Sequence, residues 1–308
     1  MIVFRSRREW ERGKMNFNIF VESVVTILQK KMGEDYEIRV TKVTKNNDIC
    51  LTGIVMLRQT DQISPTIYLE EPYKQYCEGT DLAEIVERIA ELYKAQMKNA
   101  NLDMSFFSEY ERVKDRIFHK VINYDRNKKL LSDVPHYRWC NLAIVFYYSM
   151  EAESLGRASI LIHYNHLALW NQTKETVYQA AQANMKRCMP ALFIPMQELI
   201  CEMTGISLEE NDVKMYVLTN KEKMYGASAM LYSDEIAGLS ERLDSDILIL
   251  PSSVHEVLLL PDDREHKYDF YRRMVEEVNT TQVDPEEILS YSLYRYSRKK
   301  AEIEEIIV

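Results

Sequence analysis

Hydrophobic residues in this 308-residue chain follow two spacings, and the order in which these spacings recur limits the possible folds. Three times, a pair of stretches typical of β-strands precedes a stretch whose apolar residues share one helical face. Strands joined by a short turn pair antiparallel, whereas parallel neighbours need a long crossover between them. The pattern therefore predicts an α+β protein with mostly antiparallel sheets, built from repeated hairpin-then-helix units.

The first unit starts after Met15, where a regular helical pattern first appears. Asn16 has the short polar side chain that caps helices, and Gly33 has the conformational freedom needed where a helix ends. Asp81 and Glu84 have the spacing of a capping box, which predicts the start of another helix. The elements expected in this unit are a helix over 16–33, strands over 37–44, 49–57 and 66–69, and helices over 82–93 and 105–118.

The second and third units repeat the same order with different residues, so we infer no duplication. Asp284 and Pro285 match the cap and first position of a helix, which predicts a last helix there. The other elements expected after residue 130 are strands over 139–150 and 157–163, helices over 173–188 and from Pro195, strands over 213–219 and 227–232, a helix from Ser233, strands over 246–250 and 254–260, and a helix over 267–278.

The length allows one continuous domain or two lobes. The polar stretch Asn123–Lys129 is the expected boundary, which divides the chain into an N-terminal α+β lobe over 15–125 and a C-terminal α+β lobe over 126–308. Residues 1–14 carry a net charge of +3 and no helical periodicity. They are expected to be either sequence translated from an upstream start or a disordered basic arm.

The composition limits the partners and the compartment. The net charge is −9, so residues 15–308 carry −12, and this disfavours nucleic acid and membrane surfaces as partners. The 5 cysteines are scattered with no C-x-x-C pair, which is typical of a reducing compartment. No secretory signal is visible, and the longest apolar run, 142–148, is too short to span a bilayer. We therefore expect a cytoplasmic protein.

Cofactor and metal motifs are missing from the sequence. Glycines are never closer than twelve residues, so neither the Walker-A nor the dinucleotide-binding loop can form, and we expect no cofactor. His255-Glu256 begins like a zinc-binding H-E-x-x-H motif, but Leu259 replaces the second ligand.

His163 and His166 could share a helical face, but His163 is predicted at a strand end with no acidic ligand close in sequence, which favours a turn histidine. His136 and Cys140 have the spacing of a Cys-His pair that could activate a thiolate, but Pro135 and the apolar strand that follows favour extended chain, which separates them. No metal ligand is assigned.

One segment concentrates residues suited to nucleophilic chemistry. A tight connection between two apolar runs, Pro251-Ser-Ser-Val-His-Glu256, brings hydroxyls, an imidazole and a carboxylate near one sheet edge. The same residues could instead satisfy turn amides, and no G-x-S-x-G elbow accompanies them. Both interpretations stay open, and the candidate catalytic residues are Ser252, Ser253, His255 and Glu256, with Asn220 and Asp262 as possible neighbours.

Six phrases in fixed order carry a family resemblance: Ile63–Glu70, Val121–Asn127, Tyr216–Asn220, Gly226–Ser228, Leu250–Val257 and Glu276–Asn279. Together they resemble an uncharacterised clostridial (Firmicutes) family, catalogued as domain of unknown function 5688. The resemblance covers the chain from about Met15 to its C-terminal part. It implies one family unit and an intracellular bacterial origin, and it transfers no catalytic residue.

These features favour a non-enzymatic module that binds a protein or small-molecule partner. A hydrolase or transferase of unfamiliar type, centred on the Ser252–Glu256 turn, is the alternative. A nucleic-acid accessory protein is a further alternative, which would require a positive stripe on an acidic body. An enzyme would place His255 in a concave site with other polar groups, whereas a binding module would present a patch or groove elsewhere. The sequence leaves the oligomeric state open.

Overall fold

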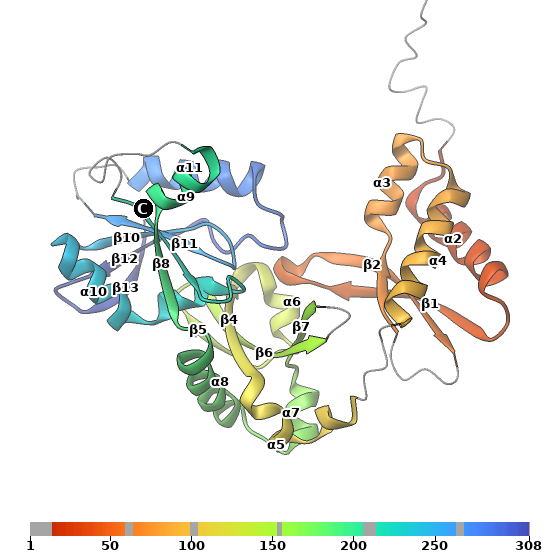
Figure 1. Cartoon of the computed structure of the whole chain (residues 1–308), viewed down its shortest axis with the longest axis horizontal. Helices are drawn as coiled ribbons and strands as arrows, with labels where there is room; N and C mark the ends of the chain where they lie inside the picture. Colours follow the sequence, from red (N-terminus) through yellow and green to blue (C-terminus); the bar gives the residue numbers. More distant parts are fainter. Residues whose placement is uncertain are drawn as a thin grey trace, which may run out of the picture. The chain divides into compact units, whose positions relative to one another are not determined.

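The structure, a computed structural model, describes residues 14–58, 64–98, 104–152, 156–205, 214–262 and 268–307 (Figure 1). The chain divides into two compact units. Unit 1 comprises residues up to 45 together with 50–103 and 151–156, and unit 2 comprises 46–49, 104–150 and 157–308. The expected boundary near residue 125 therefore falls inside unit 2. The hypotheses about the N-terminal basic segment concern residues that, apart from Lys14, lie outside the described ranges.

In its described residues, unit 1 combines three antiparallel strands in the order β1-β2-β3 with the helices α2, α3 and α4. Its elements are α2 (Phe17–Met32), β1 (Tyr36–Thr44), β2 (Cys50–Arg58), β3 (Thr66–Tyr68), α3 (Glu70–Glu78) and α4 (Leu82–Lys98). Asn16 caps α2 by accepting the Ile19 N–H at 3.0 Å, and Gly33 ends it with φ of 89°. The sequence analysis did not include α3.

The core of unit 1 lies between one face of this sheet and helices α2 and α4. Ile54 and Met56 of β2, two positions apart, together with Ile67 of β3, contribute to it, as expected for a sheet covered on one side. The fully buried members include Phe20, Val24, Leu28, Ile54, Met56 and Ala90. Because this core has its own helices and strands, unit 1 is a structural unit with its own apolar interior.

Unit 2 contains a smaller sheet in which β6 pairs with three other strands. Its strands are β4 (Ile117–Asn123), β5 (His136–Trp139), β6 (Leu142–Ala152) and β7 (Gly156–Leu161). The helix predicted over 105–118 is wrong, because short helical turns end at Arg116 and β4 begins at Ile117. All residues of β4 except Lys120 are buried, so the strand has no polar face and does not show the alternation that identifies a half-exposed strand.

The larger sheet of unit 2 has six strands in the order β13-β12-β10-β11-β9-β8, all paired antiparallel. Its strands are β8 (Ala191–Pro195), β9 (Tyr216–Asn220), β10 (Ile247–Pro251), β11 (Val257–Pro261), β12 (Leu293–Ser297) and β13 (Glu302–Ile306). The helices after β6 are α7 (Tyr164–Trp170), α8 (Lys174–Cys188), α9 (Met196–Thr204), α10 (Ser233–Leu243) and α11 (Tyr268–Thr281). One sheet face packs on α11 and the other packs on α10.

Two further predictions in unit 2 are wrong. Residues 226–231 form a 3-10 helix and not a strand, and the segment from Asp284 forms a short turn and not a helix. After this turn, Leu293 faces α11 while Tyr294 faces the opposite core, so the sheet imposes a strand where the local capping signal favoured a helix. The basic residues at 295–300 consequently lie on the β12–β13 hairpin.

The α+β prediction, with its antiparallel sheets, is confirmed by the strand pairing. All pairings between described strands are antiparallel, and helices follow hairpins in both units. Within the described ranges, no helix combines the length and apolar character that a membrane span requires.

Candidate functional site

The Ser252–Glu256 turn connects β10 to β11, as the sequence predicted. The Ser253 hydroxyl accepts the His255 N–H at 3.0 Å, and the Ser253 N–H donates to the Glu256 carbonyl at 3.2 Å. Ser253 is buried, whereas Ser252 and Glu256 are half-buried. These bonds form a serine-stabilised turn, in which the hydroxyl of Ser253 satisfies a backbone group.

Both ring nitrogens of His255 face groups of the protein itself. The Tyr225 N–H donates to Nδ1 at 3.2 Å, so Nδ1 acts as an acceptor and the proton of the neutral ring lies on Nε2. Nε2 lies 3.5 Å from Oε1 of Glu287. A general base needs an available lone pair, and the one on Nδ1 already accepts a backbone hydrogen bond. Sequence reasoning missed Glu287, which stands in the segment predicted to start the last helix.

Tyr225 provides the platform on which this imidazole lies. The two rings stack with centroids 5.4 Å apart and an interplanar angle of 14°. Lys120 Nζ lies 4.0 Å from the Tyr225 ring centroid, and the Ser159 hydroxyl lies 3.3 Å from the Tyr225 hydroxyl. Tyr225 has a φ of 52°, a left-handed conformation uncommon for a residue with a side chain. The turn and the 220–225 loop therefore support one another.

Asn220 organises that loop from a fully buried position. Its Oδ1 accepts the N–H groups of Glu222 and Met224, and its Nδ2 donates to the Met224 carbonyl at 2.8 Å. Gly226 follows this loop and packs closely against the turn, because a Cβ added to it would lie 2.6 Å from the His255 carbonyl oxygen. Asn220 is therefore brought close to the turn, but its side chain binds its own loop.

Two buried asparagines, Asn47 and Asn127, hold the segment that is hydrogen-bonded to the turn. The Val254 N–H donates to the Glu287 carbonyl at 2.8 Å, which ties the turn to the 285–288 segment. Asn47 Nδ2 donates to the carbonyls of Pro285 and Ile288 at 2.7 and 2.9 Å, and the Asn47 N–H donates to Asn127 at 2.7 Å. The position of Glu287 beside the imidazole thus depends on a residue 240 positions away in the chain.

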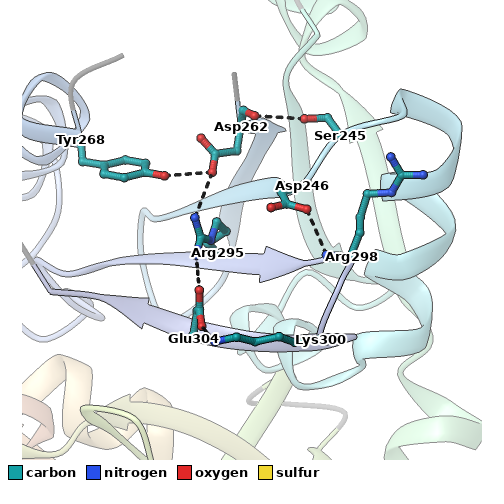
Figure 2. A network of polar contacts seen from close by, with 8 residues as sticks. All are labelled: Ser245, Asp246, Asp262, Tyr268, Arg295, Arg298, Lys300 and Glu304. Atoms are coloured by element: carbon teal, nitrogen blue, oxygen red, sulfur yellow. Dashed lines mark hydrogen bonds and ion pairs between the residues drawn. The ribbon is translucent and has the colours of Figure 1, made fainter. Parts of the chain in front are cut away.

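Asp262 is not part of this cluster. It follows β11 at the end opposite to His255, and about 13 Å of strand separates Val257 from Pro261 at ~3.3 Å per residue. Figure 2 shows its carboxylate beside Tyr268 and Arg295: the Tyr268 hydroxyl donates to Oδ2 at 2.9 Å, and Arg295 Nη1 forms an ion pair with the same oxygen at 3.9 Å. Burial together with the Asp262 hydrogen bond raises the pKa of Tyr268.

The same network continues to the β12–β13 hairpin. Glu304 accepts hydrogen bonds from Lys300 at 2.5 Å and from Arg295, and these bonds lower the pKa of its carboxyl to about 2. The Arg298 N–H donates to Asp246 at 3.0 Å (Figure 2). Each described acidic group here has a basic or backbone partner, which is typical of a structural network.

The ring nitrogens of His163 have the opposite roles to those of His255. His163 Nδ1 lies 2.7 Å from Oδ2 of Asp133, so Nδ1 carries the proton and the lone pair is on Nε2. His166 Nδ1 accepts the His163 N–H at 3.2 Å, which fixes both residues at the start of α7. His136 lies on β5 and Cys140 in the following turn, so the helical i, i+4 proximity does not form. Among the described residues, no cluster of three or more His, Cys, Asp or Glu side chains is arranged to hold a metal.

The surface hollows described in the structure belong to unit 1. One, of about 520 Å³, is lined by polar and charged residues of the α2–β1 connection and the end of β2. The other, of about 460 Å³, lies between β3, α3 and α4 and has a largely apolar lining. Neither hollow includes a residue of the Ser252–Glu256 turn.

A family model described as "Family of unknown function (DUF5688)" matches residues 17–298. The chain belongs to this family. The DUF5688 match spans almost all of both units, which agrees with the resemblance of the six ordered phrases. No curated protein and no solved structure matches the chain. Membership in DUF5688 assigns no reaction, so function has to be argued from the chain's own residues.

Proposed function

We propose that this protein is a non-enzymatic module that binds a protein or small-molecule partner. The observation that carries the proposal is the use of the turn's reactive groups within the fold. The Ser253 hydroxyl accepts a backbone N–H, and His255 Nδ1 accepts another. A hydrolase of the serine type needs a hydroxyl paired with an imidazole nitrogen, and these two groups bond to main-chain donors instead.

The hollows of unit 1 support a binding role. Ligand sites in proteins are concave and largely apolar, with a few polar groups that orient the ligand. The hollow of about 460 Å³ between β3, α3 and α4 meets this description, with isoleucines and a leucine beside one arginine. Binding at this place requires no catalytic group.

Labelling with a fluorophosphonate, which reacts with activated serine hydroxyls, tests the proposal. The full chain is incubated with the reagent, and modified residues are identified by mass spectrometry of peptides. We expect no labelling of Ser252 or Ser253, because neither hydroxyl bonds to a histidine ring of the described ranges. Labelling of either serine that disappears in His255→Gln would overturn the proposal and restore the hydrolase.

The Asp133–His163 pair favours a second candidate, an enzyme that uses His163 as an acid–base group. A carboxylate that orients Nδ1 and leaves Nε2 as the basic nitrogen is the arrangement found in acyl-transfer enzymes. Both side chains are at the surface, with 30% and 69% of their areas exposed. Serine labelling that is lost in His163→Gln but kept in His255→Gln would support this candidate.

The nucleic-acid alternative has less support. It requires unpaired cations along one surface, and three of the four basic residues over 295–300 are paired: Arg295 and Lys300 with Glu304, and Arg298 with Asp244. We retain a clostridial cytoplasmic setting as part of the proposal, supported by the ordered phrases and by five scattered cysteines without a C-x-x-C pair, which suit a reducing compartment.

A further inference from the structure

Strand β3 ends the sheet of unit 1 and has one open edge. The Leu69 N–H donates to the Thr52 carbonyl at 2.9 Å, while the Thr52 N–H donates to Oε1 of Glu70, so Leu69 is at a position whose backbone groups point towards β2. Such positions alternate along a strand, which makes Ile67 the next residue bonded to β2. Thr66 and Tyr68 therefore direct their N–H and C=O groups to the other side, where no described strand pairs with them.

The apolar hollow follows this open edge. Ile67 faces the helices and is buried in the core, whereas its neighbours Thr66 and Tyr68 face the opposite side of the sheet. A hollow that touches all three consecutive residues must therefore extend along the backbone of the strand. The rest of its lining comes from one face of α4 and from α3, and includes Ile85, Arg88, Ile89, Leu92 and Gln75.

We propose that this edge binds an extended peptide of a partner protein by antiparallel β-strand addition, a proposal that rests on the binding function above and names its partner class. Two peptide residues, opposite Thr66 and Tyr68, form four backbone hydrogen bonds with them. The peptide residue between them lies opposite Ile67. Because directly opposite residues of an antiparallel pair point to the same face, its side chain enters the hollow.

The lining determines the peptide's chemistry. Ile67, Ile85 and Ile89 form an apolar floor, and Leu92 has 47% of its area exposed, so the inserted side chain is aliphatic. Arg88 also lines the hollow, but its guanidinium pairs with Glu84, whereas half-buried Lys45 places its Nζ 4.6 Å from the Tyr68 ring centroid. The peptide residue opposite Tyr68 points to the same face as Tyr68, so Lys45 favours an acidic residue there, with a modest contribution to affinity because Lys45 is partly solvated.

A selection experiment tests which peptides bind. Phage-displayed random heptapeptides are selected on the purified full chain, and the affinity of a selected peptide is measured by fluorescence anisotropy. We expect selected sequences to share an aliphatic residue with an acidic neighbour. Leu92→Glu places a charge in the hollow and should weaken binding by about tenfold or more. Val40→Glu is the matched control, because Val40 is an aliphatic residue of the same unit with 49% exposure, and it should change affinity less than about twofold.

N-methylation of the selected peptide tests the strand pairing itself. Methylating the N–H of either residue opposite Thr66 or Tyr68 removes a backbone hydrogen bond and should weaken binding by about tenfold. Methylating the middle residue should leave the affinity nearly unchanged, because its N–H points away from β3.

Three results would overturn strand addition: the peptide binds equally well when N-methylated at any position, its affinity is the same for Leu92→Glu and Val40→Glu, or the selection yields no peptide. None of these results affects the serine-labelling test. A concentration-dependent dimer that disappears in Leu92→Glu would show that a second copy of the chain occupies the edge instead. The binding-module function fails separately, through His255-dependent labelling of serine.

Discussion

The Ser252–Glu256 turn of unit 2 and the β3–α4 hollow of unit 1 use their polar groups in opposite ways. In the turn, the side chains that suggested chemistry bond to main-chain groups of the same protein. In the hollow, backbone groups of Thr66 and Tyr68 face outward next to an apolar cavity. The reactive residue types therefore stabilise the fold, while ordinary strand residues offer unused hydrogen-bonding groups.

This contrast shows what decides whether a polar residue can act on another molecule. A hydroxyl or imidazole that already has its partner gains nothing from a ligand unless that partner is displaced, and displacement leaves a main-chain donor unpaired. An outward strand edge loses only its bonds to water when a peptide binds. Availability of the hydrogen-bonding groups, more than residue type, separates the two regions.

The largest expected loss of stability comes from adding one carbon atom to Gly226, which packs against the turn. In Gly226→Ala the new Cβ would lie 2.2 Å from Thr219 Oγ1 and 2.6 Å from the Asn220 nitrogen, and backbone atoms must move. We expect the free energy of unfolding to fall by about 3 kcal/mol or more. Gly238→Ala in α10 is the control, because nothing lies within 4 Å of its Cβ, and it should stabilise by about 0.5–1 kcal/mol. Urea unfolding followed by tryptophan fluorescence measures both, and equal effects would contradict the close packing of the turn.

Acid should weaken unit 2 selectively, since the unit 1 ranges contain no histidine. His119 in β4 is 2% exposed, and burial lowers its pKa from 6.5 to about 4. Between these two pKa values the unfolded chain binds a proton that the folded protein excludes. The free energy of unfolding therefore has its full value above pH 6.5 and decreases as the pH falls towards 4. The decrease in the free energy of unfolding is of order 3 kcal/mol in total. His119→Phe should make this decrease smaller, because phenylalanine binds no proton in the unfolded chain. Urea unfolding at pH 7 and pH 5 tests this, and an unchanged difference between the two pH values in the variant would refute the role of His119.

A smaller loss is expected behind the turn. Asn47→Gly removes the amide that donates to Pro285 and Ile288 but keeps a residue suited to the φ of 61°. The buried Ile288 carbonyl and the partly buried Pro285 contact then lose their donor, which should lower the free energy of unfolding by about 2 kcal/mol. Asn18→Ala, an exposed position, should change it by less than about 0.5 kcal/mol. Equal values for the two variants in urea unfolding would mean that the asparagine pair does not support the turn.

The smallest expected change concerns the imidazole itself. His255→Ala removes the acceptor of the Tyr225 N–H, and because 31% of the His255 side chain is exposed, water can replace it. We expect a loss of about 1 kcal/mol in urea unfolding. A larger loss, above about 3 kcal/mol, would mean that the ring is a core element and not a surface part of the turn.

Local signals were sufficient to predict part of the fold. Asn16 caps its helix as expected, because a cap depends on residues within three positions, and α8 starts within one residue of its predicted first residue. β4 was missed because both of its faces are buried, and β12 because the capping signal at Asp284 is local while strand pairing with β10 is not.

The candidate site was predictable only in composition. Ser252, Ser253, His255 and Glu256 do lie on one turn, but the carboxylate facing the imidazole is that of Glu287, and Asp262 lies at the other end of β11. Which nitrogen accepts a hydrogen bond depends on the conformation of Tyr225, which no spacing in the sequence indicates. The hollow was not predictable either, because Ile67 and Ile85 follow ordinary core patterns and a single exposed leucine such as Leu92 indicates no site.

The affinity of one selected peptide for two single variants tests the contrast between the two regions most directly. Fluorescence anisotropy is measured with Leu92→Glu and with His255→Ala, both confirmed as folded. We predict at least a tenfold loss for Leu92→Glu and less than about a twofold change for His255→Ala. A loss confined to His255→Ala would contradict the account and place the functional surface at the turn.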